Sequence, residues 1–175
     1  MLDAEDPVAV SWIDAIRSGD HETISRLLLA RPELAVERVL GSGGSRSALH
    51  LATDWPGHFP GVAATIALLV AAGADVDARF DGAHRETPLH WAASSDDVEA
   101  IDALLDAGAD LEADGAVHTG GTALADAVIF RQWRAARRLV ERGAVVLDWQ
   151  ADALADALAD ALTDTPADTE AGETA

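Results

Sequence analysis

The stretch Thr87-Pro88-Leu89-His90-Trp91-Ala92-Ala93 opens a unit that closes at Gly108-Ala109-Asp110. A hydroxyl residue followed by proline is typical of a helix start, because the hydroxyl caps free backbone N–H groups and proline fits the first turn. From Val98 to Leu105 the apolar residues are spaced by three and four, which predicts an amphipathic helix that Gly108 can end. The stretch therefore predicts a short helix, a loop and a longer helix.

The same unit recurs along the chain. Gly73, Gly108 and Gly143 lie 35 residues apart, and the apolar residues before each glycine shift by the same interval. The helix-opening motif also recurs, as Ser47-Ala48-Leu49-His50-Leu51-Ala52 and as Thr122-Ala123-Leu124-Ala125-Asp126-Ala127. An insertion, Trp55–Gly61, is rich in proline and glycine and predicts a loop.

These units, over residues from about 8 to 150, resemble the ankyrin repeat, whose signature is T-P-L-H-x-A. The resemblance implies antiparallel helix pairs, stacked sideways, with a concave face that binds proteins and rarely catalyses reactions. It also implies that His50 and His90 hydrogen-bond to the motif hydroxyls of Ser47 and Thr87. We expect an all-α ankyrin-repeat solenoid of stacked antiparallel helix pairs with long inter-repeat linkers, the glycine-rich Gly41–Gly44 being flexible.

The two ends of the chain depart from the repeat. Residues 8–34 have helix-pair spacing without the signature, as expected of a first unit whose outer face meets water. After Gly143, Ala-Asp-Ala-Leu occurs three times and predicts a capping helix over residues 148–162. Residues 163–175 offer nothing to bury and predict an acidic disordered tail. The predicted domain spans residues 7–162, with units at about 8–40, 45–78, 85–113 and 120–147.

Composition limits the classes of function. The 175 residues include 31 acidic and 12 basic side chains, giving a formal net charge of −19, and no cysteine. The lack of cysteine excludes disulfides, thiolate zinc sites and cysteine nucleophiles. We find no basic patch to neutralise phosphates, and the longest apolar stretch, Ile66–Ala74, is too short to span a bilayer. We therefore expect no nucleic acid and no membrane as partners.

The same composition bears on origin and location. The first residues are acidic and lack the basic start and apolar core of a secretory signal, which favours the cytoplasm. Alanine, aspartate and arginine abound while lysine is absent, a bias that GC-rich bacterial codons produce. Adaptation to salt is the alternative explanation for the acidity.

No group of residues has the spacing of a catalytic or metal site. Helical His-Glu-x-x-His, Gly-x-Ser-x-Gly and phosphate-binding glycine loops are all missing. His58, His84 and His118 fall in the insertion and linkers, where solvated histidines are common. Asp96 with Glu99 has capping-box spacing, which assigns it to starting a helix. We expect no catalytic residues, no cofactor and no metal.

Candidate binding residues follow from the repeat register. One set lies at the end of each short helix and the other at the linker tips, where exposed aromatic and arginine side chains mark recognition sites. Packing beneath the loops is the alternative for Trp55 and Phe130, whereas Trp91 and Trp133 occupy core positions. The predicted partner-binding residues are Trp55, Phe80, His84, Arg85, Ser94, Ser95, His118, Ile129 and Phe130.

The leading hypothesis is a monomeric, non-catalytic module that binds another protein through the concave face and linker tips. A second hypothesis is an acidic inhibitor, such as an immunity protein or antitoxin, that covers a basic enzyme site. A third is a metal-dependent hydrolase, which requires His84 and His118 to converge. A fourth is a marginally stable remnant of a longer repeat array.

Overall fold

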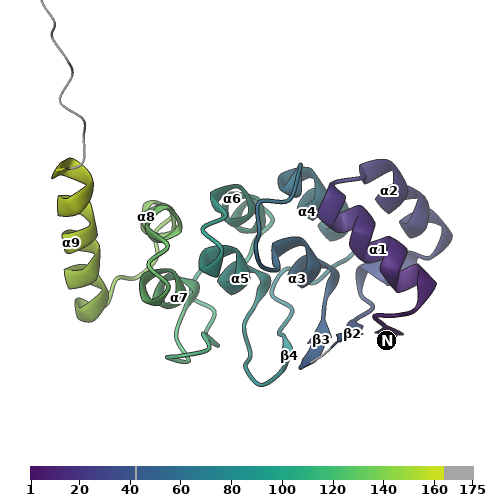
Figure 1. Ribbon diagram of the computed structural model, residues 1–175, viewed down its shortest axis with the longest axis horizontal. Helices are drawn as coiled ribbons and strands as arrows, with labels where there is room; N and C mark the ends of the chain where they lie inside the picture. The colour runs from purple at the N-terminus through teal and green to yellow at the C-terminus, as the bar shows by residue number, and fades with distance from the viewer. Residues whose placement is uncertain (42, 164–175) are drawn as a thin grey trace, which may run out of the picture.

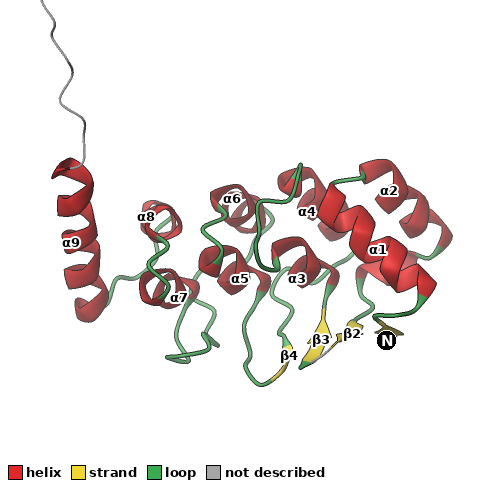
Figure 2. Ribbon diagram, in the orientation of Figure 1, coloured by secondary structure: helices red, strands yellow, loops and turns green. Residues whose placement is uncertain are grey.

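The computed structural model describes residues 1–41 and 43–163 of the chain. Helix pairs follow one another along its length (Figures 1 and 2). The helices are α1 (Pro7–Ser18), α2 (His21–Ala30), η1 (Pro32–Ala35, a 3-10 turn), α3 (Ala48–Thr53), α4 (Val62–Ala71), α5 (Pro88–Ser94), α6 (Val98–Asp106), α7 (Ala123–Ile129), α8 (Trp133–Glu141) and α9 (Asp148–Thr163).

The helices form two rows. The inner row, α1, α3, α5 and α7, consists of successive neighbours, and so does the outer row, α2, α4, α6 and α8. Figure 1 shows α9 lying across the end of the stack, where it contacts both α7 and α8. The predicted all-α solenoid of antiparallel helix pairs is confirmed.

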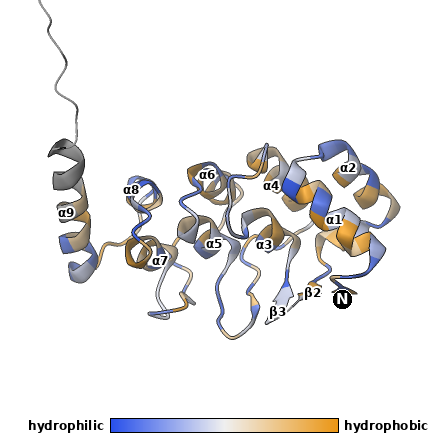
Figure 3. Cartoon of the chain, in the orientation of Figure 1, coloured by the Kyte–Doolittle hydropathy of each residue, from blue (hydrophilic) through white to orange (hydrophobic). Residues whose placement is uncertain are grey.

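Burial of equivalent residues holds neighbouring pairs together. Ile66, Ile101 and Ala136 are fully buried and 35 residues apart, as are the leucines at 69, 104 and 139. Each buried isoleucine or leucine contributes roughly 1.5–3 kcal/mol. In Figure 3 apolar residues colour much of the inner row, whereas α8 carries a strongly hydrophilic side.

The signature histidines connect one unit to the next. His50 Nδ1 lies 2.7 Å from Ser47 Oγ and His90 Nδ1 lies 2.9 Å from Thr87 Oγ1, which confirms the expected pairs. Each Nε2 reaches a carbonyl of the following unit at 3.1 Å, Glu86 for His50 and Gly121 for His90. A carbonyl only accepts, so Nε2 carries the proton and Nδ1 accepts.

Burial keeps both rings neutral. It lowers the pKa of His50 to about 3 and also lowers the pKa of His90. The fourth unit has Ala125 at this position, so this type of connection ends at α7.

Gly41 and Gly44 lie in strands, which corrects the expectation of a flexible Gly41–Gly44 segment at these two residues, whereas Ser42 lies outside the described residues. The strands β1 (Leu2–Asp3), β2 (Val39–Gly41), β3 (Gly44–Arg46) and β4 (Asp81–Gly82) form one small sheet in that order. β1 and β2 are parallel and the other pairs antiparallel. Gly44 has φ +148°, and a Cβ there would collide with the Asp81 carbonyl. The glycines therefore allow close strand pairing.

Helix caps agree with the sequence in one place and differ in another. Asp20 caps α2 by accepting the Thr23 N–H at 3.0 Å, as predicted. The cap of α6 is Asp97, which accepts the Ala100 N–H, and not Asp96. Asp96 has φ +55° and accepts the Ala135 N–H of the next unit instead.

The C-terminal helix runs one residue further than predicted, to Thr163. The rest of the predicted disordered tail, residues 164–175, lies outside the described residues. Within the described part, every helix falls short of the length and apolarity needed to cross a bilayer.

Replacing His50 with alanine removes a connection between units and leaves a cavity. The variant leaves Ser47 Oγ and the Glu86 carbonyl without the ring, so we expect the free energy of unfolding to fall by about 2–4 kcal/mol. Urea denaturation measures this change. Leu29→Ala, at an 86% exposed position on α2, is the control and should stay within about 0.5 kcal/mol of the wild type. An equally small effect for His50→Ala would contradict the connecting role.

Candidate functional site

A pocket of about 220 Å³ opens where three inner-row helices end. Its lining residues come from three successive units: Asp54, Trp55, His84, Glu86, Trp91, Ser94, Ser95, Val117 and Phe130. Asp54, Ser95 and Phe130 are the C-cap residues of α3, α5 and α7. The repeat itself therefore brings together side chains that lie far apart in the sequence. We call this site the inner pocket.

Five of the nine predicted binding residues line the inner pocket, namely Trp55, His84, Ser94, Ser95 and Phe130. Trp55 is 80% exposed and Phe130 is 40% exposed. His118 lies against Phe130 with ring centroids 5.4 Å apart. Ile129 is partly exposed on α7, and Arg85 is exposed but does not line the pocket.

Phe80 is a correction, because it is buried and not at an exposed linker tip. It is only 5% exposed and stacks on His84 at a centroid distance of 4.6 Å. The Phe80 N–H donates to the Glu86 carbonyl at 2.8 Å, so the linker turns back on itself. This turn carries the ring inward against Trp91, 5.4 Å away.

Trp91 is a second correction, since it is half-buried at the pocket wall and not in the core. Its indole Nε1 donates to Glu86 Oε2 at 2.8 Å. Glu86 also accepts the Val117 N–H at Oε1, 2.9 Å away, and His84 Nδ1 lies 3.0 Å from Oε2. Glu86 is 5% exposed. Sequence reasoning missed it; its only signal is an acidic residue directly before the signature threonine.

Asp54 is neutralised by basic groups of its own chain. It accepts from Arg17 at 2.7 Å, and Arg46 Nε lies 3.8 Å away. The Arg46 guanidinium lies 5.7 Å from the Trp91 ring centroid. The acidic groups of the site that no arginine pairs with are therefore Glu86 and the residue buried behind it.

Behind Glu86 lies Asp126, a fully buried carboxyl group. Neither of its oxygens accepts a hydrogen bond from a donor in the described part of the chain, and its polar neighbour is the Glu86 carboxylate. Burial, followed by the neighbouring Glu86 carboxylate, raises the pKa of Asp126 to about 8. Glu86 receives the available donors, so the shared proton belongs on Asp126 near neutral pH.

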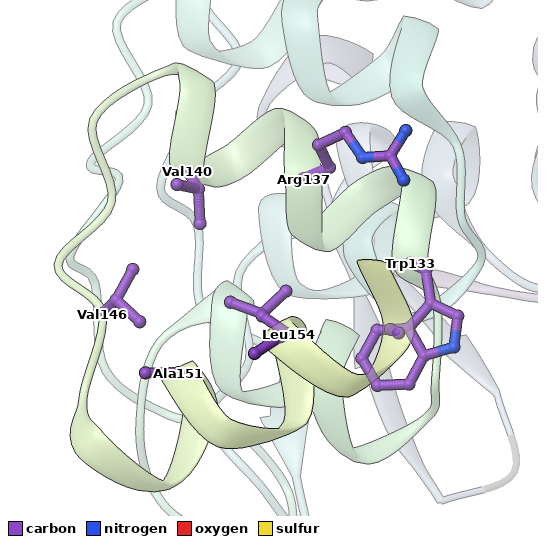
Figure 4. Close-up of a pocket in the computed structure, with 8 residues that line it drawn as sticks. Trp133, Arg137, Val140, Val146, Ala151 and Leu154 are labelled. Carbon is purple, nitrogen blue, oxygen red and sulfur yellow. The ribbon is translucent and has the colours of Figure 1, made fainter. Parts of the chain in front are cut away.

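A second hollow, about 300 Å³, lies between α8 and α9 and is mostly apolar. Figure 4 shows Trp133, Val140, Val146 and Leu154 around it, with Arg137 at its edge. Trp133 is half-buried and packs against the core, so its predicted core position is confirmed although one side of the ring lines this hollow. No further repeat covers α8 within the described residues.

Arginines gather on α8 and at its two ends, a basic cluster that was not predicted from the sequence. Those at 131, 134, 137, 138 and 142 account for five of the chain's twelve basic residues. Arg138 and Arg142 bind Asp102 of α6 at 2.7 and 2.8 Å, and hydrogen bonds from Arg138 above all lower the pKa of Asp102. Part of this positive charge therefore joins two units.

The metal-enzyme hypothesis finds no ligand set in the part of the chain that is described. There, no three histidine, aspartate or glutamate side chains gather closely enough to hold a metal ion. His84 stacks on Phe80 while His118 lies against Phe130. Each histidine is therefore accounted for by an aromatic contact.

The buried acid makes the stability of the protein depend on pH. The folded state keeps the proton on Asp126 to about pH 8, whereas the unfolded chain releases it near 3.8. Between these values stability falls as pH rises, by up to about 1.4 kcal/mol per unit. We expect wild type to lose about 1 kcal/mol between pH 7 and pH 8 relative to Asp126→Asn, measured by urea denaturation. Parallel pH profiles would contradict this.

The comparisons with known proteins agree with the geometry. The ankyrin-repeat family matches residues 62–148, in three copies. No curated protein matches the chain. Ankyrin repeats are generally protein-interaction modules and are typically non-catalytic. With its 35-residue period, its signature motifs and its two rows of paired helices, the chain is an ankyrin-repeat protein.

Proposed function

We propose that residues 7–162 form a monomeric, non-catalytic domain that binds a partner protein through the inner pocket. The observation that carries the proposal is that Trp55, 80% exposed, lies in the same hollow as Phe130. An exposed tryptophan forgoes the free energy of burial, and aromatic side chains are common anchors of protein interfaces.

The insertion loop holds Trp55 in position. The His58 N–H donates to Asp97 Oδ2 at 2.6 Å, and His58 Nε2 lies 3.0 Å from the Ser95 carbonyl. The loop of the second unit is thereby tied to the third unit. A pocket wall fixed in this way loses little conformational entropy on binding.

The two exposed aromatic side chains should account for much of the affinity. We expect the double variant Trp55→Ala, Phe130→Ala to bind the partner at least about 30-fold more weakly, since anchor residues contribute about 2 kcal/mol or more. The partner is isolated on immobilised wild type from a lysate of the source cells, and its Kd is then measured with purified proteins. Leu29→Ala should bind like wild type. Equal binding by the double variant would contradict the proposal.

The inhibitor hypothesis remains a second candidate, favoured by the charge of the repeats themselves. Of the 31 acidic residues, 23 precede Asp148, alongside all 12 basic ones. A surface of this kind attracts a basic protein at long range, and salt screens that attraction beyond about 8 Å at physiological ionic strength.

Salt separates the two candidates. For an inhibitor of a basic enzyme we expect the association rate to fall at least about tenfold between roughly 0.05 and 0.5 M salt, measured by stopped-flow fluorescence. Association that is insensitive to salt would exclude the inhibitor and leave the general binding module.

A further inference from the structure

We propose that the inner pocket receives one cationic side chain of the partner, an arginine, which displaces the proton that Glu86 and Asp126 share. This inference rests on the proposed function and specifies the chemistry of the residue bound. It draws on the size of the pocket, its aromatic walls and the two buried carboxyl groups.

Size is the first argument. The pocket measures about 220 Å³, below the range of about 300 Å³ and more in which drug-sized ligands bind. It therefore suits one side chain of a partner better than a free metabolite.

The walls favour a positive group. Trp55, Trp91 and Phe130 line the pocket, and aromatic faces attract guanidinium and ammonium groups, most strongly when water is excluded. The protein already makes this contact once, because the Arg46 guanidinium lies 5.7 Å from the Trp91 ring centroid. Arg46 and Arg17 share the single carboxylate of Asp54, so these three groups together carry one net positive charge and the negative charge of the site is that of Glu86.

The carboxyl groups of Glu86 and Asp126 at the floor of the pocket provide the negative charge that a bound cation needs. Glu86 lines the pocket and accepts from Trp91 Nε1 and from Val117 N–H. Asp126, buried beside it, accepts no hydrogen bond within the described residues, so only its own proton bonds it to Glu86. A buried carboxylate without a donor is costly, and a guanidinium bound at Glu86 would compensate a charge on Asp126.

The exchange balances in charge and atoms. One proton leaves the carboxyl pair for solvent as one cation binds, so the net charge of the pocket stays constant. The helices that contact α7 carry these other charged or titratable groups in their described part: His90 on α5, Arg134, Arg137, Arg138 and Glu141 on α8, and Asp148 and Asp152 on α9. The adjoining linkers add Arg79, His84, Asp114, His118 and Arg131. Among them and Glu86, only Glu86 raises the pKa of Asp126 in addition to burial.

Two small probes test this directly. N-acetyl-arginine methylamide carries the cation, and N-acetyl-citrulline methylamide has nearly the same shape without charge. Each is titrated into the full chain while the indole N–H signals of Trp55 and Trp91 are followed by NMR. We expect the arginine compound to bind at least about tenfold more tightly at pH 8, since it alone forms the charged contacts.

The pH profile gives the second readout. Arginine stays charged throughout, so its affinity should rise about tenfold from pH 7 to pH 9 and then level off, as Asp126 ionises. Asp126→Asn should remove this rise, and Glu86→Gln should remove the preference for arginine over citrulline.

Tryptophan variants locate the binding. Trp55→Ala removes an exposed side chain and should weaken arginine binding without unfolding the protein. Trp149→Ala removes another partly exposed indole, 43% exposed and outside the pocket, and should leave binding unchanged.

Equal affinity for the two probes, a flat pH profile in wild type, or no shift of the Trp55 and Trp91 signals would each overturn the inference. The proposed function fails separately, if the partner binds independently of Trp55 and Phe130. If the partner binds through Trp55 and Phe130 but the pocket does not prefer the arginine probe to the citrulline probe, the proposed function stands and the inference about an arginine is wrong.

Discussion

The hydrogen bond from His50 Nε2 to the Glu86 carbonyl supports both the stack of repeats and the site built on it. The imidazole is buried and its pKa is lowered to about 3, so the ring stays neutral through the mildly acidic range and the connection needs no charge. It fixes the backbone of the residue whose side chain forms the pocket floor. The same contact that aligns the second unit with the third therefore also sets the position of the Glu86 carboxylate.

Apolar burial and ion pairs hold neighbouring units together in addition to this hydrogen bond. Aliphatic residues spaced by 35 fill the space between neighbouring pairs, and this packing is the larger contribution because each fully buried side chain adds roughly 1.5–3 kcal/mol. The Arg138 and Arg142 contacts to Asp102 are partly exposed, so solvent weakens them and they mainly fix how α8 lies on α6. The charges of Arg138 and Arg142 are thus structural.

Much of the fold follows from local sequence, because period, caps and apolar spacing act over a few residues. The helix pairs and the loop at Trp55–Gly61 could be predicted in this way. The inward turn of Phe80 could not, since it depends on a hydrogen bond to Glu86 and on stacking with His84, both across a linker. Glu86 and Asp126 escaped notice because single acidic residues carry no period. The repeat register nevertheless predicts where the pocket lies, because the pocket forms where the short helices end.

The buried acid pair shows why an uneven repeat is informative. Asp126 occupies the position that Trp91 holds one unit earlier and Leu51 holds two units earlier. Leu51 is apolar and needs only burial. The indole N–H of Trp91 donates a hydrogen bond to Glu86. At Asp126 neither solution applies, and the carboxyl group must hold a proton to remain buried. An apolar residue at this position would make the protein more stable, because burying a carboxyl group costs free energy that burying an apolar side chain does not. The arrangement thus gives up stability at a position next to the floor of the inner pocket, as expected where a site, and not the scaffold, determines the residue.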